Sequence, residues 1–326
     1  MMKRCLNCME EYEEQRDACP VCGWNKAAEE GAWLEPGTIL SGRYILGTVR
    51  GESPADILYI GWDAMFARKV LVMEYFPDSC VYRGTDGAVE VKEGKKALFD
   101  KGLARFWENG NTLIQMDGTP GLLNVFAGTE GNGTAYLIWE YPGERTLRDV
   151  FLEASPYSLE QAEKLVMKLA EPLLAAHRKG LYHGQLSVDR CYFTADKKVL
   201  AGGFNDAGFV TGDWEEADTG KPGPQADIFG LAHIVGAALT GLSRWEAQTV
   251  DDSLNEMEEE YPSYVVDALE DAMSEDLDRC QENLRRFVDQ FLDEATIEMP
   301  SNRVYQEEAP RKGSPIWNFL HRQADK

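Results

Sequence analysis

Four cysteines near the N-terminus are the residues whose type and spacing most directly indicate chemistry. Cys5 and Cys8 form one Cys-x-x-Cys pair, and Cys19 and Cys22 form a second pair after ten intervening residues. Each pair can present two thiolates to one tetrahedral zinc ion, and four thiolates leave no coordination position open for a substrate. We therefore predict a structural zinc ribbon over residues 1–26, folded by metal binding worth on the order of 10 kcal/mol.

The competing interpretation of these cysteines is a redox-active thiol pair. Neither Cys-x-x-Cys motif lies at a strand-to-helix junction of the thioredoxin kind, and two pairs recur close together, which favours zinc. The other three cysteines, Cys80, Cys191 and Cys280, are scattered along the chain, unlike an extracellular disulfide framework. We expect these three thiols to be reduced and structurally passive.

The composition is that of a globular protein with a strongly acidic surface. The chain has 326 residues, 44% of them hydrophobic, with a formal net charge of -23 and a pI near 4.6. Such a surface repels phosphate backbones and anionic lipid headgroups, which argues against nucleic acid or an acidic membrane as a partner. No apolar signal segment is visible, and the longest nearly apolar stretch, 229–239, is too short to cross a bilayer as a helix. We expect a cytoplasmic protein with no membrane span.

Beyond the cysteines, strand signals dominate the first half of the chain and helical signals the second. A helix is predicted around 98–116, and from Leu159 the apolar spacing becomes helical up to His177. A sheet-rich front half and a helix-rich back half predict an α+β fold in two lobes. Strands are predicted near residues 44–47, 57–62, 69–73, 123–129 and 135–141.

Several motifs in this part resemble bacterial serine/threonine protein kinases and follow one another in the order of that family. Residues 34–83 resemble the N-lobe, and residues 135–141 (AYLIWEY) resemble the hinge. Residues 180–183 (GLYH) resemble the approach to a catalytic loop. Residues 227–230 (DIFG) resemble the start of the central C-lobe helix, and residues 276–279 (DLDR) resemble the late Asp-x-x-Arg element.

The resemblance implies a protein-kinase-like domain over residues 36–295. Its small β-rich N-lobe would cover about 36–140, and its larger helical C-lobe would cover about 141–295. A linker over 27–35 would join it to the zinc ribbon. Residues 296–326 are predicted to form a mobile tail, because they combine several prolines with polar sequence.

In the predicted N-lobe, the positions that would contact MgATP differ from the family pattern. Gly51 remains from the glycine-rich loop, but Pro54 lacks a backbone donor and Asp56 brings a carboxylate that repels phosphate. Met73 stands where the family has its phosphate-clamping lysine, and Asn109 aligns with the helical glutamate that pairs with that lysine. A thioether and an amide cannot form this ion pair.

The catalytic loop and the metal-binding positions differ as well. Gln185 aligns with the catalytic aspartate of the family and cannot accept a proton as a carboxylate does. Arg190 stands at the metal-binding asparagine, where a guanidinium competes with Mg²⁺ for space and charge. Gly203 replaces the aspartate of Asp-Phe-Gly, ahead of Phe204.

Other family positions are retained, and we assign them structural roles. His183 is expected to brace the catalytic loop and Asp227 to anchor it, while Phe204 is expected in the core. Trp139 is interpreted as a packed core residue that fills space near the hinge rather than a ligand platform. A vestigial nucleotide pocket is expected near Gly51, Trp139, Glu140 and Phe204.

Six replacements at positions that contact MgATP or support its binding favour a pseudokinase, a signalling scaffold or regulatory module that binds a protein partner. ATP and Mg²⁺ are not expected as its cofactors. The alternative is a divergent serine/threonine kinase, or another ATP-dependent transferase, that uses displaced residues. Lys69, Asp189 and Asp206 are the candidates for that role.

Overall fold

The computed structural model describes residues 2–25, 31–207, 223–274, 276 and 278–293. The chain divides into two compact units. The N-terminal unit contains the first 118 residues together with 123–141 and the segment that begins at Asn205. The C-terminal unit contains residues 119–122, 142–204 and the helices that follow. The predicted tail, 296–326, lies outside the described residues.

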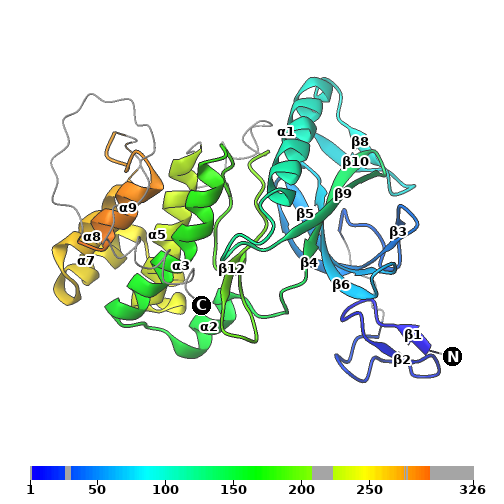
Figure 1. Ribbon diagram of the computed structural model, residues 1–326, viewed down its shortest axis with the longest axis horizontal. Coiled ribbons are helices and arrows are strands. Elements are labelled where there is room, and N and C mark those ends of the chain that lie inside the picture. The colour runs from blue at the N-terminus through cyan, green and yellow to red at the C-terminus, as the bar shows by residue number, and fades with distance from the viewer. Residues whose placement is uncertain (1, 26–30, 208–222, 275, 277, 294–326) are drawn as a thin grey trace. The chain divides into compact units, whose positions relative to one another are not determined.

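The N-terminal unit is built on a six-stranded antiparallel sheet with the strand order β3-β4-β5-β6-β10-β9 (Figure 1). Helix α1 (Lys96–Ile114) packs against β9 and β10. Its buried Phe99, Phe106 and Leu113 recur every seven residues, which places them on one face. The strands are β3 (Ile39–Leu40), β4 (Tyr44–Ser53), β5 (Asp56–Asp63), β6 (Arg68–Tyr75), β9 (Val125–Gly131) and β10 (Thr134–Glu140).

Two short hairpins complete the N-terminal unit. Strands β1 (Met2–Arg4) and β2 (Glu11–Glu13) pair within the cysteine-rich segment. Strands β7 (Val81–Arg83) and β8 (Val89–Val91) form a hairpin between β6 and α1 that the sequence analysis did not predict. Three-residue strands carry too little periodicity to be recognised from a single sequence.

The C-terminal unit is mainly helical, with one small hairpin. Helix α3 (Leu159–His177) begins with a capping box between Ser158 and Gln161, and it packs against α5 and α9. Helix α5 is apolar and buried along most of its length, as expected for a central helix. The other elements are α2 (Leu147–Ala154), β11 (Cys191–Phe193), β12 (Val199–Ala201), α5 (Pro224–Thr240), α6 (Leu242–Ala247), α7 (Val250–Glu260), α8 (Ser263–Met273) and α9 (Leu284–Phe291).

The predicted α+β architecture is confirmed, with a β-rich N-terminal unit and a helical C-terminal unit. The strands predicted at 44–47, 57–62 and 69–73 correspond to β4, β5 and β6. Each observed strand is longer than the predicted one, because polar residues extend it beyond the apolar run. Among the residues that the structure describes, none of the helices is long and apolar enough to cross a membrane.

Candidate functional site

The four N-terminal cysteines converge on one point. Their Sγ atoms all lie within 4.8 Å of one another, with Cys5 Sγ 3.6 Å from Cys22 Sγ and Cys8 Sγ 3.7 Å from Cys19 Sγ. A tetrahedral zinc with Zn–S bonds of about 2.3 Å requires sulfur–sulfur separations of about 3.8 Å. The cluster therefore has the geometry of a structural zinc site.

The surroundings of these thiols favour a bound cation. Burial raises the pKa of the Cys8 and Cys5 thiols, so both sulfurs become thiolates readily only where positive charge compensates. Burial also opposes ionisation of Cys22. Hydrogen bonds from the Trp24 backbone, from Asn7 and from the neighbouring cysteines outweigh burial there and lower the pKa of that thiol to about 7. Zinc would supply the missing positive charge.

In the N-terminal unit, Met73, which aligns with the family's phosphate-binding lysine, lies inside the sheet. Met73 is fully buried on β6, where it pairs with Leu58 of β5 and Leu137 of β10. Asn109 is buried on α1, and its side-chain nitrogen donates to Asp206 at 2.7 Å. Neither side chain offers a charge to a phosphate.

Asp206 forms an ion pair that the sequence analysis did not predict. Arg105 of α1 binds its carboxylate with two nitrogens, at 2.8 Å and 2.5 Å, and Asn109 adds a third donor. The Asp206 side chain is only 4% exposed. Arg105 and Asn109 are four residues apart and therefore share one face of the helix. This cluster, Arg105–Asn109–Asp206, tethers α1 to the segment that begins at Asn205.

Asp56 and Lys69 are also engaged within the N-terminal unit. Asp56, the carboxylate expected near the phosphates, is fully buried and accepts a hydrogen bond from Asn205 Nδ2 at 3.1 Å. Lys69 Nζ lies 2.7 Å from Glu10 Oε1 of the cysteine-rich segment. Both groups thus have partners within the unit.

The expected pocket positions of the N-terminal unit differ in exposure. Trp139 is 1% exposed in the core, as the sequence analysis proposed, and its indole N–H has no hydrogen-bond partner among the described residues. Glu140 accepts a hydrogen bond from Asn124 Nδ2 at 2.9 Å. Gly51 is exposed, and a Cβ atom there would meet nothing within 4 Å.

In the C-terminal unit, Arg190 reaches both Gln185 and Gly203, two further positions that were compared with the family pattern. Its Nη2 donates to Gln185 Oε1 at 2.9 Å, and its Nη1 lies 3.4 Å from the carbonyl oxygen of Gly203. A Cβ atom on Gly203 would lie 2.7 Å from Arg190 Nη1, too close for any real contact. Gly203 also has φ +80, which disfavours other residues. Gly203 therefore makes the space that the Arg190 guanidinium fills.

In the C-terminal unit, Asp227, His183 and Phe204 are buried and support the loop that begins at His183. Asp227 is fully buried and accepts hydrogen bonds from the backbone N–H groups of His183 at 2.8 Å and Gly184 at 2.7 Å. His183 Nε2 lies 2.9 Å from the Gly202 carbonyl oxygen, and its ring centroid is 4.4 Å from that of Phe204. Burial lowers the pKa of His183 to about 4, so the imidazole is neutral at pH 7.

Asp189, the last displaced candidate, lies on the surface. Arg148 of α2 binds its carboxylate with two nitrogens, at 2.7 Å and 2.9 Å, and also contacts Glu246 at 2.8 Å. The bidentate geometry fixes both carboxylate oxygens of Asp189 on one guanidinium. Sequence alone gives no signal for this pair, because its partners are 41 residues apart.

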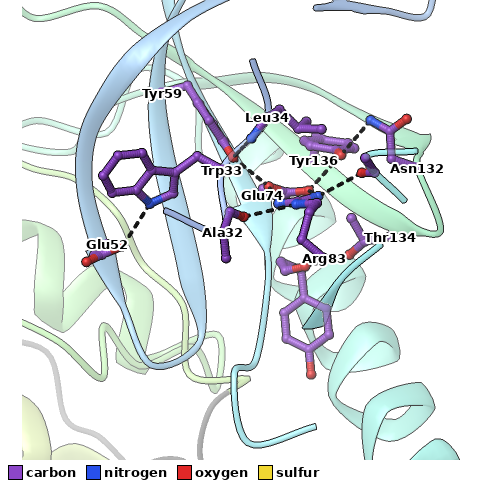
Figure 2. Close-up of polar contacts among 12 residues, drawn as sticks. Ala32, Trp33, Leu34, Glu52, Tyr59, Glu74, Arg83, Asn132, Thr134 and Tyr136 are labelled. Atoms are coloured by element: carbon purple, nitrogen blue, oxygen red, sulfur yellow. Dashed lines mark hydrogen bonds and ion pairs between the residues drawn. The ribbon is translucent and has the colours of Figure 1, made fainter. Parts of the chain in front are cut away.

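A buried polar cluster around Glu74 was not predicted either. Figure 2 shows the Glu74 carboxylate at its centre, with Tyr59, Tyr136 and Arg83 directed toward it. Both tyrosine hydroxyls donate at 2.8 Å, and two Arg83 nitrogens donate at 2.8 Å and 2.6 Å. Glu74 is fully buried, and four donors offset the cost of burying its charge. We assign this Glu74 cluster to the support of the sheet.

Comparison with known proteins places this architecture among protein kinase domains. The chain superimposes on the apo form of PpkA-294 with a TM-score of 0.58 and 18% identity, covering 80% of this chain and all of that one. It superimposes on a single-residue mutant of the Mycobacterium tuberculosis PknI kinase domain with a TM-score of 0.55 and 15% identity, covering 81% of this chain and 99% of that one. The fold is that of a protein kinase domain.

Sequence comparison finds distant relatives among bacterial serine/threonine protein kinases. The chain is 26% identical over 214 residues, 60% of its length, to the serine/threonine-protein kinase PknK of Mycobacterium tuberculosis. It is 25% identical over 157 residues, 45% of its length, to a probable serine/threonine-protein kinase PknB of Bifidobacterium longum. These matches span only about a fifth of each relative, 19% and 20%. No protein-family model matches the chain. The chain is thus a distant homologue of bacterial serine/threonine protein kinases.

Proposed function

We propose that this chain is a pseudokinase, a kinase-shaped module that binds a protein partner and regulates it without transferring phosphate. The observation that carries the proposal is the position of Arg190. Its guanidinium contacts Gln185 and lies against Gly203. The resemblance aligns Arg190 with the family's metal-binding position, so these contacts support a fixed positive charge in place of the metal ion. A cation at this place repels Mg²⁺, and neither neighbour supplies a carboxylate to hold one.

The candidates for a displaced active site support the proposal as well. Lys69, Asp189 and Asp206 each form an ion pair, with Glu10, Arg148 and Arg105 respectively. Asp206 and Asp189 are held by bidentate arginines, which are among the strongest side-chain interactions of a carboxylate. Arg105 and Arg148 place a positive charge beside these two carboxylates, which disfavours Mg²⁺ binding there.

The function that remains for such a domain is binding. A kinase domain has a large surface, and the net charge of -23 favours partners with a basic or neutral surface over nucleic acid. We therefore propose a protein partner, with the zinc ribbon as a structural part of the module.

The test is a phosphate-transfer assay on the purified full chain with radiolabelled ATP and Mg²⁺. We expect no transfer to the chain itself or to a general acceptor protein. Transfer that is abolished by Asp206→Asn or Asp189→Asn, and retained in a surface control such as Asp196→Asn, would support the divergent-kinase alternative instead. The control carboxylate is exposed and belongs to the turn between β11 and β12.

A further inference from the structure

The first Cys-x-x-Cys knuckle contacts the kinase-like sheet through the two residues between its cysteines. The Leu6 carbonyl oxygen accepts a hydrogen bond from the Thr48 N–H at 2.9 Å. Asn7 Oδ1 accepts from Thr48 Oγ1 at 2.8 Å and from Arg50 Nη1 at 3.0 Å. Arg50 also donates to the Asn7 carbonyl oxygen. The metal-binding knuckle and strand β4 are therefore one hydrogen-bonded structure.

The sheet is shaped to receive this knuckle. A Cβ atom on Gly47 would lie 2.1 Å from the Leu6 carbonyl oxygen, so only glycine permits this approach. On neighbouring strands, the Arg4 guanidinium lies 3.5 Å from the ring centroid of Trp62, and Glu10 pairs with Lys69. Figure 1 shows the β1–β2 hairpin next to the ends of β4 and β6.

A second contact follows the cysteine-rich segment in sequence. The Trp33 indole N–H donates to Glu52 Oε2 at 2.9 Å, near the end of β4. The adjacent Leu34 is buried, and its backbone N–H donates to the Tyr59 hydroxyl at 3.1 Å. Figure 2 shows Leu34 beside the Glu74 cluster and Trp33 turned toward Glu52. Residues 33 and 34 thus connect the Glu74 cluster to the β4–β5 hairpin.

We propose that the cysteine module is a zinc-dependent clamp on the β4–β5 hairpin. Zinc bound by the four cysteines fixes the Leu6–Asn7 backbone, and that backbone holds Thr48 and Arg50. Trp33 holds the same hairpin at Glu52, close to its turn. The hairpin contains Gly51, where the resemblance places the glycine-rich loop, so metal content would set the order of this loop. This inference does not depend on whether the chain transfers phosphate.

The dependence on zinc follows from the size of the module. A segment of about twenty residues buries too little apolar surface to fold alone, so metal binding supplies its folding free energy. Without the ion, the backbone between Cys5 and Cys8 keeps only its hydrogen bonds, among them those from Thr48 and Arg50, and loses the cross-link to Cys19 and Cys22. Asn7 Nδ2 also lies 3.6 Å from Cys22 Sγ, so one side chain contacts both the ligand set and the sheet.

Hydrogen–deuterium exchange on the full chain tests the clamp, because the Thr48 amide is itself one of the contacts. We expect removal of zinc with a chelator to speed exchange in peptides covering residues 44–58 by about tenfold or more. Peptides from α3 and α5 in the C-terminal unit should exchange at unchanged rates and serve as the internal reference. Returning zinc alone should restore the slow exchange.

The variant Asn7→Ala keeps all four cysteines but removes the side-chain contacts to Thr48, Arg50 and Cys22, so its zinc content is measured together with its exchange. At saturating zinc we expect one zinc per chain and faster exchange at residues 44–58. The matched control is Val21→Ala, at the equivalent position of the second knuckle, where the side chain is 65% exposed. It should leave both zinc content and exchange unchanged. Unchanged exchange at residues 44–58 after zinc removal, or equal behaviour of the two variants, would overturn the proposal.

Discussion

Replacing Arg105 with methionine tests whether Asp206 is a structural group of the N-terminal unit. The substitution keeps a long, flexible side chain in helix α1 but removes both donors to the Asp206 carboxylate. Asp206 is then left buried, at 4% exposure, with the Asn109 amide as its remaining side-chain donor among the described contacts. Removing one partner of a buried ion pair typically costs roughly 3–5 kcal/mol, because a charge is stranded.

The exposure of Arg105 lowers this expectation. Its side chain is 29% exposed, so water already weakens the pair, and we expect a loss of about 2 kcal/mol in the free energy of unfolding. The reverse change, Asp206→Asn, lets Arg105 turn to water and to Glu108, which lies 3.6 Å away. It should cost only about 1 kcal/mol. The predicted signature is this asymmetry between the two partners.

Chemical denaturation of both variants measures the two losses, and the double variant Arg105→Met/Asp206→Asn gives their coupling. A loss of about 2 kcal/mol corresponds to roughly 4–8 °C in melting temperature for a unit of this size. Equal costs near zero for both single variants would refute the tether. A stabilising Arg105→Met would also refute it, because the pair would then cost stability rather than supply it.

Metal content, acid stability and a restored lysine give three more predictions. Purified protein should contain one zinc per chain by metal analysis, and replacing Cys80, Cys191 or Cys280 with serine should not change that content. His183 has a pKa of about 4 in the folded protein and about 6.5 in the unfolded chain, so the unfolded chain takes up a proton first as the pH falls. The free energy of unfolding is therefore unaffected by this residue above pH 6.5 and decreases as the pH falls from 6.5 toward 4. The loss amounts to about 3 kcal/mol, and His183→Gln should flatten this part of a stability–pH profile; an unchanged slope would contradict the assignment. Met73→Lys should not create phosphate transfer, because Gln185, Arg190 and Gly203 still lack the required groups, and measurable transfer by that variant would contradict the reasoning.

Much of the architecture could be predicted because it is encoded locally. The helix from Leu159 to His177 has a clear start signal and regular apolar spacing, and it was found at its observed bounds. The long strands are visible as β-branched and aromatic runs. The β7–β8 and β11–β12 hairpins have only three residues per strand, and their pairing depends on the rest of the fold.

Among the candidate sites, too, those encoded by local spacing could be predicted, and those formed by residues far apart in the sequence could not. The zinc cluster could be predicted because two Cys-x-x-Cys knuckles encode their geometry within the spacing itself. The Arg105–Asp206 pair joins residues 101 positions apart, and the Asp56–Asn205 contact joins residues 149 apart. Nothing local distinguishes these side chains from exposed ones. Only the Arg105–Asn109 spacing hinted at a shared helix face.

The measurement that tests the central claim most directly is thermal unfolding with and without millimolar MgATP. A ligand at 100 times its dissociation constant stabilises a native state by about 2.7 kcal/mol, which is roughly 5–11 °C at about 2–4 °C per kcal/mol. Because we assign Met73 to the position of the phosphate-binding lysine and Arg190 to the position of the metal ligand, we predict no resolved shift. A shift of several degrees that disappears when magnesium is withheld would contradict the account and return Asp189 and Asp206 to the list of metal ligands.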